Sequence, residues 1–488
     1  MPAATGAPPA APSRAGAGIT ADKPGKRYLV RKLAARPGTD HPPRILVIGG
    51  GHLGLYAAQR LQQRLPPGEA ELILAEPLTH MTYQPLLPEV AAGTVEPRHV
   101  TVPVRPALPR FHVVTAEVVE LRHADRTARV RLIDGSERDL AYDHVVVGPG
   151  TVSRTAPVPG LAELAVGFET LGEAVFLRNR VIIQLALAAS TSDPAVRRRA
   201  LTFVVFGAGY AGVEAVGELS DRSMDAIKTF AELRHEKVRW ILVEPTDRIL
   251  PEVSPALGEY TANVLRARGV EIWLETSIAS CVGGRVRFHG RHAGDVVEAN
   301  TKVWTAGIRP HPMLDHTDLP RDPEGRVLAD AYLRVRGTPG AWTGGDCAAV
   351  PDLTCDEPGA LCAPTAQHAI RQGRRLADNL VADVRGPQRN GPPKPYRHRY
   401  AGSVMGMGRM QGVAEVYGVR LSGTPAWLLH RVYHWLMLPS GAGKARVLTD
   451  WIFDALFSRD ISALAELQEP HKPLQTAARA PAPSTQTA

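Results

Sequence analysis

The fold is decided by residues 45–54, Ile45-Leu46-Val47-Ile48-Gly49-Gly50-Gly51-His52-Leu53-Gly54. Four consecutive apolar residues that end in glycines are typical of a strand buried on both faces of a parallel sheet. Gly49 permits a tight turn, Gly51 lets the backbone approach a pyrophosphate, and Gly54 lets the following helix pack closely on the strand. The N-terminus of that helix offers free N–H groups to phosphates. Glu76 ends the next expected strand and would accept hydrogen bonds from a ribose hydroxyl, so this stretch predicts a dinucleotide-binding unit.

The same pattern occurs a second time. The apolar strand at residues 202–206 precedes the glycine loop at residues 207–212, which reads Gly207-Ala208-Gly209-Tyr210-Ala211-Gly212. Glu244 closes the neighbouring strand, where an acid favours a free 2′-hydroxyl and repels a 2′-phosphate. NADH is therefore expected over NADPH, although Arg248 nearby would act in the opposite direction. Two dinucleotide sites in one chain imply one bound flavin and one exchangeable nicotinamide.

Composition and charge describe an ordinary globular protein with a basic C-terminal part. Of the 488 residues, 44% are hydrophobic and 22% charged, and the formal net charge is +8. Residues 366–460 hold fourteen Lys/Arg against six Asp/Glu, a surplus that equals the net charge of the whole chain. Four cysteines are too few for a disulfide scaffold, which indicates a reducing compartment. The sequence contains no uninterrupted apolar run of about eighteen residues, as a transmembrane helix would need.

The expected organisation follows from these units and from Pro- and Ala-rich ends. We expect disorder at 1–43, the first dinucleotide-binding unit at 44–155 and a connecting segment at 156–200. The second unit follows at 201–324, the return of the chain to the first unit at 325–400, a membrane-associating region at 401–468, and a disordered tail at 469–488. The N-terminus has no continuous apolar segment and does not read as a secretory signal.

Further segments resemble one family of flavoproteins. Thr343-Gly344-Gly345-Asp346 resembles its late flavin motif, and Trp304-Thr305-Ala306-Gly307 resembles the segment that returns the chain from the NAD domain. Pro364-Thr365-Ala366-Gln367-His368-Ala369-Ile370-Arg371-Gln372-Gly373 is similar to its A-Q-x-A-x-x-Q-G helix start, Gln84-Pro85-Leu86-Leu87 to its early flavin loop, and residues 421–428 to its tail. The match spans about residues 44–467. The chain thus resembles the type II (non-proton-pumping) NADH:quinone oxidoreductases, which are flavoproteins with two dinucleotide-binding domains.

The resemblance implies an α/β fold with two Rossmann-like domains of the glutathione-reductase type, one for non-covalent FAD and one for NADH. The implied FAD contacts are Gly49, Gly51, His52, Leu53, Gly54, Glu76, Gln84, Gly150, Asp346, Ala366 and Gln367. The implied NADH contacts are Gly207, Gly209, Tyr210, Ala211, Gly212, Glu214, Glu244 and Gly307. Gln367 and Glu214 are the implied catalytic residues, placed beside the quinone; alternatively, Gln367 only caps a helix and Glu214 only complements a helix dipole. Gly148-Pro149-Gly150 departs from the family's A-T-G, and proline removes one backbone donor.

The tail supplies the argument for a membrane. Residues 426–438 are aromatic-rich, basic and too short to span a bilayer. An apolar stripe recurs at helical spacing further on, namely Val447, Leu448, Trp451, Ile452, Ala455 and Leu456, flanked by Lys444, Arg446 and Arg459. Tryptophan beside basic residues suits a helix lying in the interface above anionic lipid. The alternative is an amphipathic helix packed on the body of the protein or on a dimer partner.

The expected reaction transfers electrons from NADH through the flavin to a membrane quinone, with no metal and no covalent nucleophile. The expected partners are the quinone and an anionic membrane surface, with a possible homodimer and no nucleic acid. The expected location is peripheral, on the cytoplasmic face of the cell membrane. Two rival hypotheses stay open. One is a soluble NADH-dependent reductase of a protein acceptor or of oxygen, and the other is a non-catalytic NAD(H)-responsive binding protein.

Overall fold

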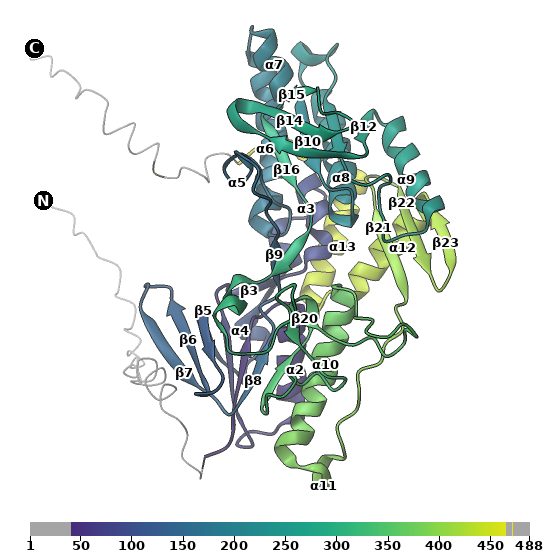
Figure 1. Ribbon diagram of the computed structural model, residues 1–488. Helices are drawn as coiled ribbons and strands as arrows, with labels where there is room; N and C mark the ends of the chain where they lie inside the picture. Colours follow the sequence, from purple (N-terminus) through teal and green to yellow (C-terminus); the bar gives the residue numbers. More distant parts are fainter. Residues whose placement is uncertain (1–40, 465–470, 472–488) are drawn as a thin grey trace, which may run out of the picture.

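The computed structural model describes residues 41–464 and residue 471, arranged as two lobes with a C-terminal unit beside them (Figure 1). The disorder predicted at 1–43 and 469–488 falls almost wholly outside these residues. Within the described part of the chain, no helix is both long and apolar enough to cross a bilayer.

The first lobe is built on a seven-stranded sheet in the order β19-β8-β1-β2-β5-β6-β7. These strands are β19 (Ala341–Thr343), β8 (His144–Val147), β1 (Arg44–Ile48), β2 (Glu71–Glu76), β5 (His112–Arg122), β6 (Thr127–Leu132) and β7 (Glu137–Ala141). β1 pairs in parallel with β2 and β8, as expected of its apolar run at residues 45–48, while β5, β6 and β7 pair antiparallel. Helices α2 (His52–Arg64) and α10 (Ala366–Arg385) contact each other, so distant segments of the chain complete this lobe.

The second lobe repeats the arrangement with a four-stranded parallel sheet. Its order is β12 (Val270–Trp273), β11 (Arg239–Val243), β10 (Thr202–Phe206) and β16 (Thr301–Trp304). Helix α8 (Tyr210–Ile227) follows β10, and α9 (Pro255–Ala267) precedes β12. An antiparallel sheet of β13 (Thr276–Ser280), β14 (Arg285–Gly290) and β15 (Val296–Glu298) lies beside it.

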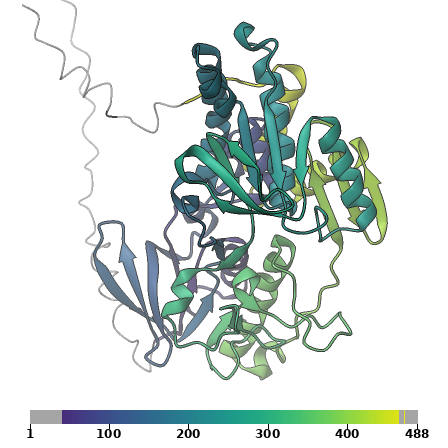
Figure 2. The ribbon, with the colours of Figure 1, turned by 45° about the horizontal axis from the view of Figure 1, so that its top comes forward.

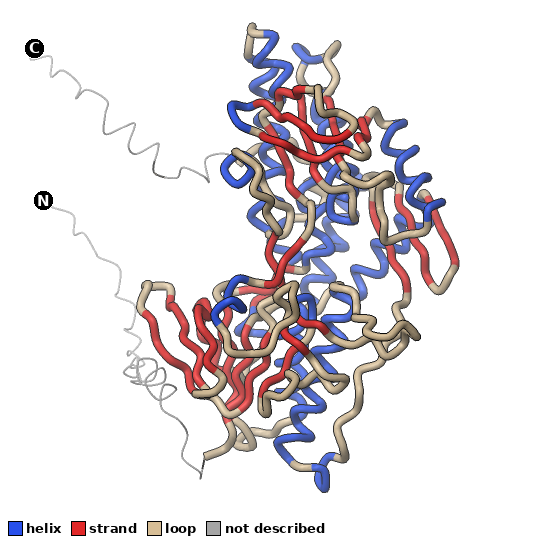
Figure 3. Tube along the Cα trace, viewed as in Figure 1, coloured by secondary structure: helices blue, strands red, loops and turns tan. Residues whose placement is uncertain are grey.

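The lobes are joined by two short strands and a group of helices. β9 (Thr151–Ser153) pairs antiparallel with β17 (Ile308–Pro310), and Figure 3 shows this pair running from one lobe to the other. The connecting segment contains α5 (Leu161–Leu164), α6 (Leu171–Ser190) and α7 (Pro194–Ala200). Helix α6 starts at a capping box in which Thr170 and Glu173 satisfy each other's backbone N–H groups. It contacts α8 and also α3 (Leu87–Ala92), which follows η1 (Gln84–Leu86).

The C-terminal unit opens with a sheet that the sequence did not predict. Residues 402–422, part of the expected membrane-associating region, form β21 (Gly402–Gly406), β22 (Gly412–Val416) and β23 (Val419–Ser422). Figure 2 shows this sheet beside α9. Gly217 lets the segment around Met407 approach α8 closely, because a Cβ on Gly217 would lie 2.8 Å from the carbonyl carbon of Met407. Helices α12 (Thr424–Met437) and α13 (Gly441–Leu456) follow, confirming helical structure in the tail.

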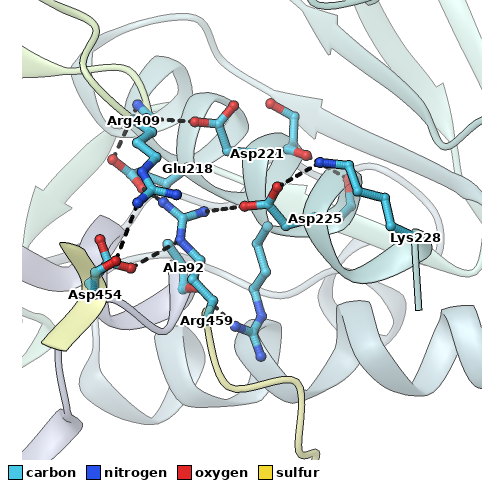
Figure 4. A network of polar contacts seen from close by, with 12 residues as sticks. Ala92, Glu218, Asp221, Asp225, Lys228, Arg409, Asp454 and Arg459 are labelled. Carbon is cyan, nitrogen blue, oxygen red and sulfur yellow. Dashed lines mark hydrogen bonds and ion pairs between the residues drawn. The ribbon is translucent and has the colours of Figure 1, made fainter. Parts of the chain in front are cut away.

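Buried charges fix these helices to the lobes. Arg459, predicted to face lipid, instead points inward with a side chain that is 3% exposed. Its guanidinium lies 3.5 Å from Asp454, 3.9 Å from Asp225 and 4.0 Å from Glu218 (Figure 4). The prediction was wrong for this residue because its acidic partners on α8 lie far upstream in the sequence. Glu89 of α3 likewise accepts a hydrogen bond of 2.6 Å from the indole of Trp451.

Candidate active site

The first glycine loop leaves one position open toward a ligand. Gly49 has a positive φ of 88°, and a Cβ on Gly54 would lie 1.8 Å from the carbonyl oxygen of Gly49. These two glycines are therefore required by the turn and by the close approach of α2. A Cβ on Gly51 would have no heavy atom within 4 Å, so the backbone there faces open space at the N-terminus of α2. This is the position at which a pyrophosphate would need close access.

The two acids that follow the glycine loops have matching environments. The N–H of Gly50 donates to Oε2 of Glu76 at 2.5 Å, and the N–H of Ala208 donates to Oε2 of Glu244 at 2.8 Å. A second backbone N–H, from Leu78 or Thr246, reaches the other oxygen in each case. Each carboxylate thus fixes its glycine loop to the adjacent strand. A carboxylate has about four acceptor sites, so each also keeps capacity for ribose hydroxyls.

A cavity of about 540 Å³ opens above the first loop. Of the residues predicted to contact FAD, it is lined by Gly49, Gly51, His52, Leu53, Glu76, Gln84, Gly150, Asp346 and Ala366. Gly54 packs beneath the loop, and Gln367 lines a neighbouring pocket instead. Pro149 also lines this cavity, so the departure Gly148-Pro149-Gly150 leaves its wall intact.

Unpartnered polar atoms in this cavity fit a polyol-bearing cofactor. Oδ1 of Asp346 and Nε2 of His52 are buried without a hydrogen-bond partner among the described residues. Burial raises the pKa of Asp346 to about 6 and lowers the pKa of His52 to about 4. Burial, together with Glu173 and Asp346, also raises the pKa of Glu169 to about 7. Hydroxyl groups of a ribityl chain would supply the missing partners, so the residues present fit FAD.

The start of α10 explains the family motif in physical terms. Oε1 of Gln372 accepts a hydrogen bond of 2.6 Å from the N–H of Gly345, next to Asp346. A Cβ on Gly373 would lie 2.5 Å from the carbonyl oxygen of Leu53, so glycine lets α10 pack closely on α2. The motif therefore positions the flavin-side loop and the helix that carries Gln367.

A second, mainly apolar pocket of about 330 Å³ lies where both lobes and the C-terminal unit meet. Helix α10 contributes Ala366, Gln367 and Ile370; α8 contributes Tyr210 and Glu214; the tail contributes Gly402, Ser403, Val404, Val416, Leu429, Tyr433, His434 and Met437. Tyr83, Pro85, Thr365, Tyr400 and Ala401 complete the lining. Ala366 lines this pocket and the FAD cavity, which makes the two cavities neighbours at the N-terminus of α10.

The structure brings both predicted catalytic residues into this pocket. Oε1 of Gln367 accepts hydrogen bonds from Nε2 of His398 at 2.7 Å and from the N–H of Ala401 at 3.1 Å. Gln367 therefore does more than cap α10, whose N-cap is Thr365. Oε1 of Glu214 accepts a hydrogen bond of 3.3 Å from the N–H of Gly406 and lies 3.6 Å from Nε2 of His430.

The predicted NADH residues gather at the N-terminus of α8. Gly207 has a φ of 98°, and a Cβ on Gly212 would lie 1.9 Å from the carbonyl oxygen of Gly207, as in the first loop. Gly209, Tyr210 and Ala211 are half-buried at the start of the helix. Gly207 lies close to the backbone of Ala306, which directly precedes Gly307. Arg248 donates to the carbonyl groups of Pro251 and Val253, which occupies its guanidinium away from Glu244.

Several residues of the site were missed by reasoning from sequence. They are Tyr83, Glu169, His398, Tyr400, His430, Tyr433 and His434, which line or adjoin the two cavities. Only the histidines of α12 carried a local signal: they are polar residues four positions apart in a mainly apolar helix.

Comparisons with known proteins agree with this geometry. A family model for pyridine nucleotide-disulphide oxidoreductases matches residues 43–373. The type II NADH:quinone oxidoreductase of Staphylococcus epidermidis is 30% identical over 80% of this chain and 93% of its own. The corresponding Ndh protein of Mycobacterium tuberculosis is 29% identical over 86% of this chain and 90% of its own.

The fold agrees with a solved structure as well. NDH2 from Plasmodium falciparum in complex with NADH superposes with a TM-score of 0.79 at 16% identity, over 86% of this chain and all of that chain. The predicted fold class of two Rossmann-like domains is thereby confirmed, and so is the resemblance. The chain belongs to the pyridine nucleotide-disulphide oxidoreductase family and, within it, to the type II NADH:quinone oxidoreductases.

Proposed function

We propose that this protein oxidises NADH by way of bound FAD and reduces a quinone that reaches the pocket from a membrane surface. The observation that carries the proposal is the apolar pocket that holds Gln367 and Glu214, adjoins the FAD cavity and has α12 as one wall. An apolar pocket with few polar groups suits a ring with two carbonyl oxygens.

The chain's own residues hold and orient the reactants. Gly51, Glu76 and Asp346 would hold the FAD, which when bound supplies the capacity to take up a hydride and pass on electrons. Glu244 and the loop at 207–212 would hold NADH, with the carboxylate accepting from ribose hydroxyls and repelling a 2′-phosphate. Gln367 would donate its amide N–H to a quinone oxygen in the pocket.

The outer surface of α12 and α13 supports a membrane-bound acceptor. Helix α12 buries its polar residues His430, Arg431 and His434, whereas Leu428, Val432 and Leu436 are exposed on its opposite side. The large apolar side chains that are exposed in α12, in α13 and in the described residues that follow them are Leu428, Val432, Leu436, Leu448, Ile452, Phe453, Leu456, Phe457, Ile461 and Leu464; we call these ten residues the apolar face. Large apolar side chains exposed in this number on neighbouring elements are typical of a contact site for a membrane or another protein.

The apolar face also lies close to the pocket. Leu429, Tyr433 and Met437 line the pocket from the same helix that turns Leu428, Val432 and Leu436 outward. The long apolar tail of a quinone could therefore stay in lipid while its ring enters. Arg446 is exposed on α13 and would face anionic headgroups, with the protein peripheral on the cytoplasmic face. A homodimer stays a prediction, because the structure describes a single chain.

Anaerobic stopped-flow tests the core of this proposal. NADH should reduce the flavin of the purified holoprotein, and a short-chain quinone should then reoxidise it. Reduction without reoxidation by quinone would favour the rival reductase of a protein acceptor or oxygen. Slow reduction to a long-lived charge-transfer complex would favour the non-catalytic binding protein.

Liposome binding tests the membrane part separately. The triple variant Leu448→Ser, Ile452→Ser and Leu456→Ser removes three exposed apolar side chains, each worth about 1.5–3 kcal/mol when buried. It should lose binding to phosphatidylglycerol-containing vesicles while keeping turnover with water-soluble quinone. The matched control is Ile133→Ser, an exposed residue of the first lobe that should bind vesicles normally. Unchanged binding of the triple variant would overturn membrane docking through this face.

A further inference from the structure

A row of buried polar rings connects Glu214 with the far side of the pocket. His430 and His434 project from the inner face of α12 and are 4% and 9% exposed, and Tyr83 is 2% exposed. Nε2 of His430 lies 3.6 Å from Oε1 of Glu214, and Nδ1 of His434 lies 3.1 Å from the hydroxyl of Tyr83. The two histidine rings meet edge to face, with centroids 4.5 Å apart.

His430 is energetically unusual as a purely structural residue. Neither of its ring nitrogens has a hydrogen-bond partner among the described residues. A neutral imidazole always carries one N–H, and burying an unsatisfied donor costs about 1–3 kcal/mol. A leucine or methionine at this place would avoid that cost. A buried polar group without a partner in the chain calls for an explanation, such as a bound water, an ion or a catalytic role.

His434 has the protonation state that a relay needs. Burial, together with the neighbouring His430 and His52, holds the pKa of His434 well below its ordinary value, so the ring is neutral near pH 7. A neutral imidazole can accept a proton on one nitrogen and donate one from the other. The other titratable groups around this row are Tyr56 and Tyr433, which act on Tyr83, and no carboxylate other than Glu214 lies within ion-pair distance of His430 among the described residues.

The reaction itself demands a supply of protons. NADH delivers two electrons and one hydrogen nucleus, whereas conversion of a quinone to a quinol requires two electrons and two protons. One further proton must therefore come from the surroundings in every turnover. The pocket is mainly apolar, so this proton needs side chains that carry it to the quinone oxygen.

We propose that Glu214, His430, His434 and Tyr83 form the route by which this proton reaches the quinone, an inference that rests on the proposed function. The proton binds first at Glu214, whose side chain is 15% exposed, and passes to His430. Transfer between the two histidines takes a ring rotation or one bridging water. The O–H bond of Tyr83 breaks as the quinone O–H bond forms, and Tyr83 recovers its proton from Nδ1 of His434. The electron pair comes from NADH, and no other reactant is needed.

The sharpest test compares acceptors that do and do not take up protons. Ferricyanide accepts electrons without protons, so the variants Tyr83→Phe and His430→Gln should keep ferricyanide turnover and flavin reduction by NADH within about twofold. Their quinone turnover should fall about 10²-fold, the usual worth of one acid–base group. The solvent deuterium isotope effect on flavin reoxidation by quinone should rise in both variants. His123→Gln, which replaces an equally buried histidine of the first lobe, is the matched control and should change neither acceptor selectively.

The possible outcomes distinguish failure of the relay from failure of the proposed function. Equal losses with quinone and ferricyanide, or an unchanged quinone rate, would overturn the relay. Tyr83→Phe removes one oxygen and keeps the ring, so it remains informative if His430→Gln fails to fold. A wild-type protein that turns over ferricyanide but no quinone would instead overturn the proposed function.

Discussion

Nε2 of His398 lies 2.7 Å from Oε1 of Gln367, and this contact determines which end of the amide faces the pocket. The same oxygen accepts from the backbone N–H of Ala401, which can only donate, so the atom there must be oxygen. His398 then carries its proton on Nε2. Burial, with Arg371 and His368 adding to it, lowers the pKa of His398 to about 4, which keeps the ring neutral. The NH₂ group of Gln367 is left free to donate to a ligand.

His398 is therefore a positioning residue for Gln367, and its loss should weaken quinone binding. In His398→Phe we expect the KM for quinone to rise about two- to tenfold, the value of one neutral hydrogen bond of about 0.5–1.5 kcal/mol. Turnover with ferricyanide should stay unchanged. His398→Gln, which can still donate to Oε1, should recover the wild-type KM.

A double-mutant cycle with Gln367→Ala separates this role from simple packing. If His398 acts through Gln367, His398→Phe should have no further effect on the KM once the amide is gone. Additive effects of the two substitutions would contradict the assignment.

Asp346 should make the flavin-free protein less stable at neutral pH than at mildly acidic pH. Burial raises its pKa to about 6, above the value of about 4 expected in the unfolded chain. The folded state therefore binds the proton more tightly, so stability is present below pH 4 and is lost as pH rises toward 6 and beyond. Asp346→Asn should raise the Tm of the flavin-free protein at pH 7 and flatten its decline between pH 4 and 7. The exposed Asp356→Asn is the control, and an unchanged slope in Asp346→Asn would refute the burial argument.

The local parts of this architecture could be predicted from the sequence, and the long-range parts could not. Gly49 and Gly207 were recognisable because each turn lies directly between a strand and its helix. Gln367 was recognisable from its motif. Tyr83 and His434 are 351 residues apart, and no local sequence pattern predicts the contact between them. Arg459 shows the opposite error, since a basic residue beside an apolar stripe suggests lipid until α8 supplies its acidic partners.

Glu244 should control the choice between the two nicotinamide cofactors. Backbone N–H groups of Ala208 and Thr246 hold its carboxylate in place, and Arg248 donates to the carbonyl group of Pro251. The ribose end of the expected NADH site therefore carries a negative charge. In Glu244→Ala we expect the ratio of kcat/KM for NADH over NADPH to fall about tenfold, which corresponds to ~1.4 kcal/mol. Steady-state kinetics with ferricyanide measure this ratio without involving quinone. The control is Glu271→Gln, at an acid on the neighbouring strand, which should leave the ratio unchanged. If the ratio stays unaltered in Glu244→Ala, Glu244 does not determine the choice of cofactor.

Arg459 should be essential for holding the C-terminal unit on the second lobe. Its guanidinium lies among Glu218, Asp225 and Asp454, and burial raises the pKa of Glu218 to about 7. Arg459→Met leaves these acids without their cation, which costs about 3–5 kcal/mol when a buried pair is broken from one side. The Tm of the holoprotein should fall clearly.

The exposed pair of Arg420 with Glu415 provides the comparison for Arg459. In Arg420→Met the Tm should hardly change, because an exposed ion pair contributes about 0–1 kcal/mol. Adding Glu218→Gln to Arg459→Met should recover part of the lost Tm, since it removes one of the uncompensated buried charges. Equal Tm values for Arg459→Met and Arg420→Met would mean that the apolar contacts of α12 and α13, and not this ionic cluster, hold the unit in place.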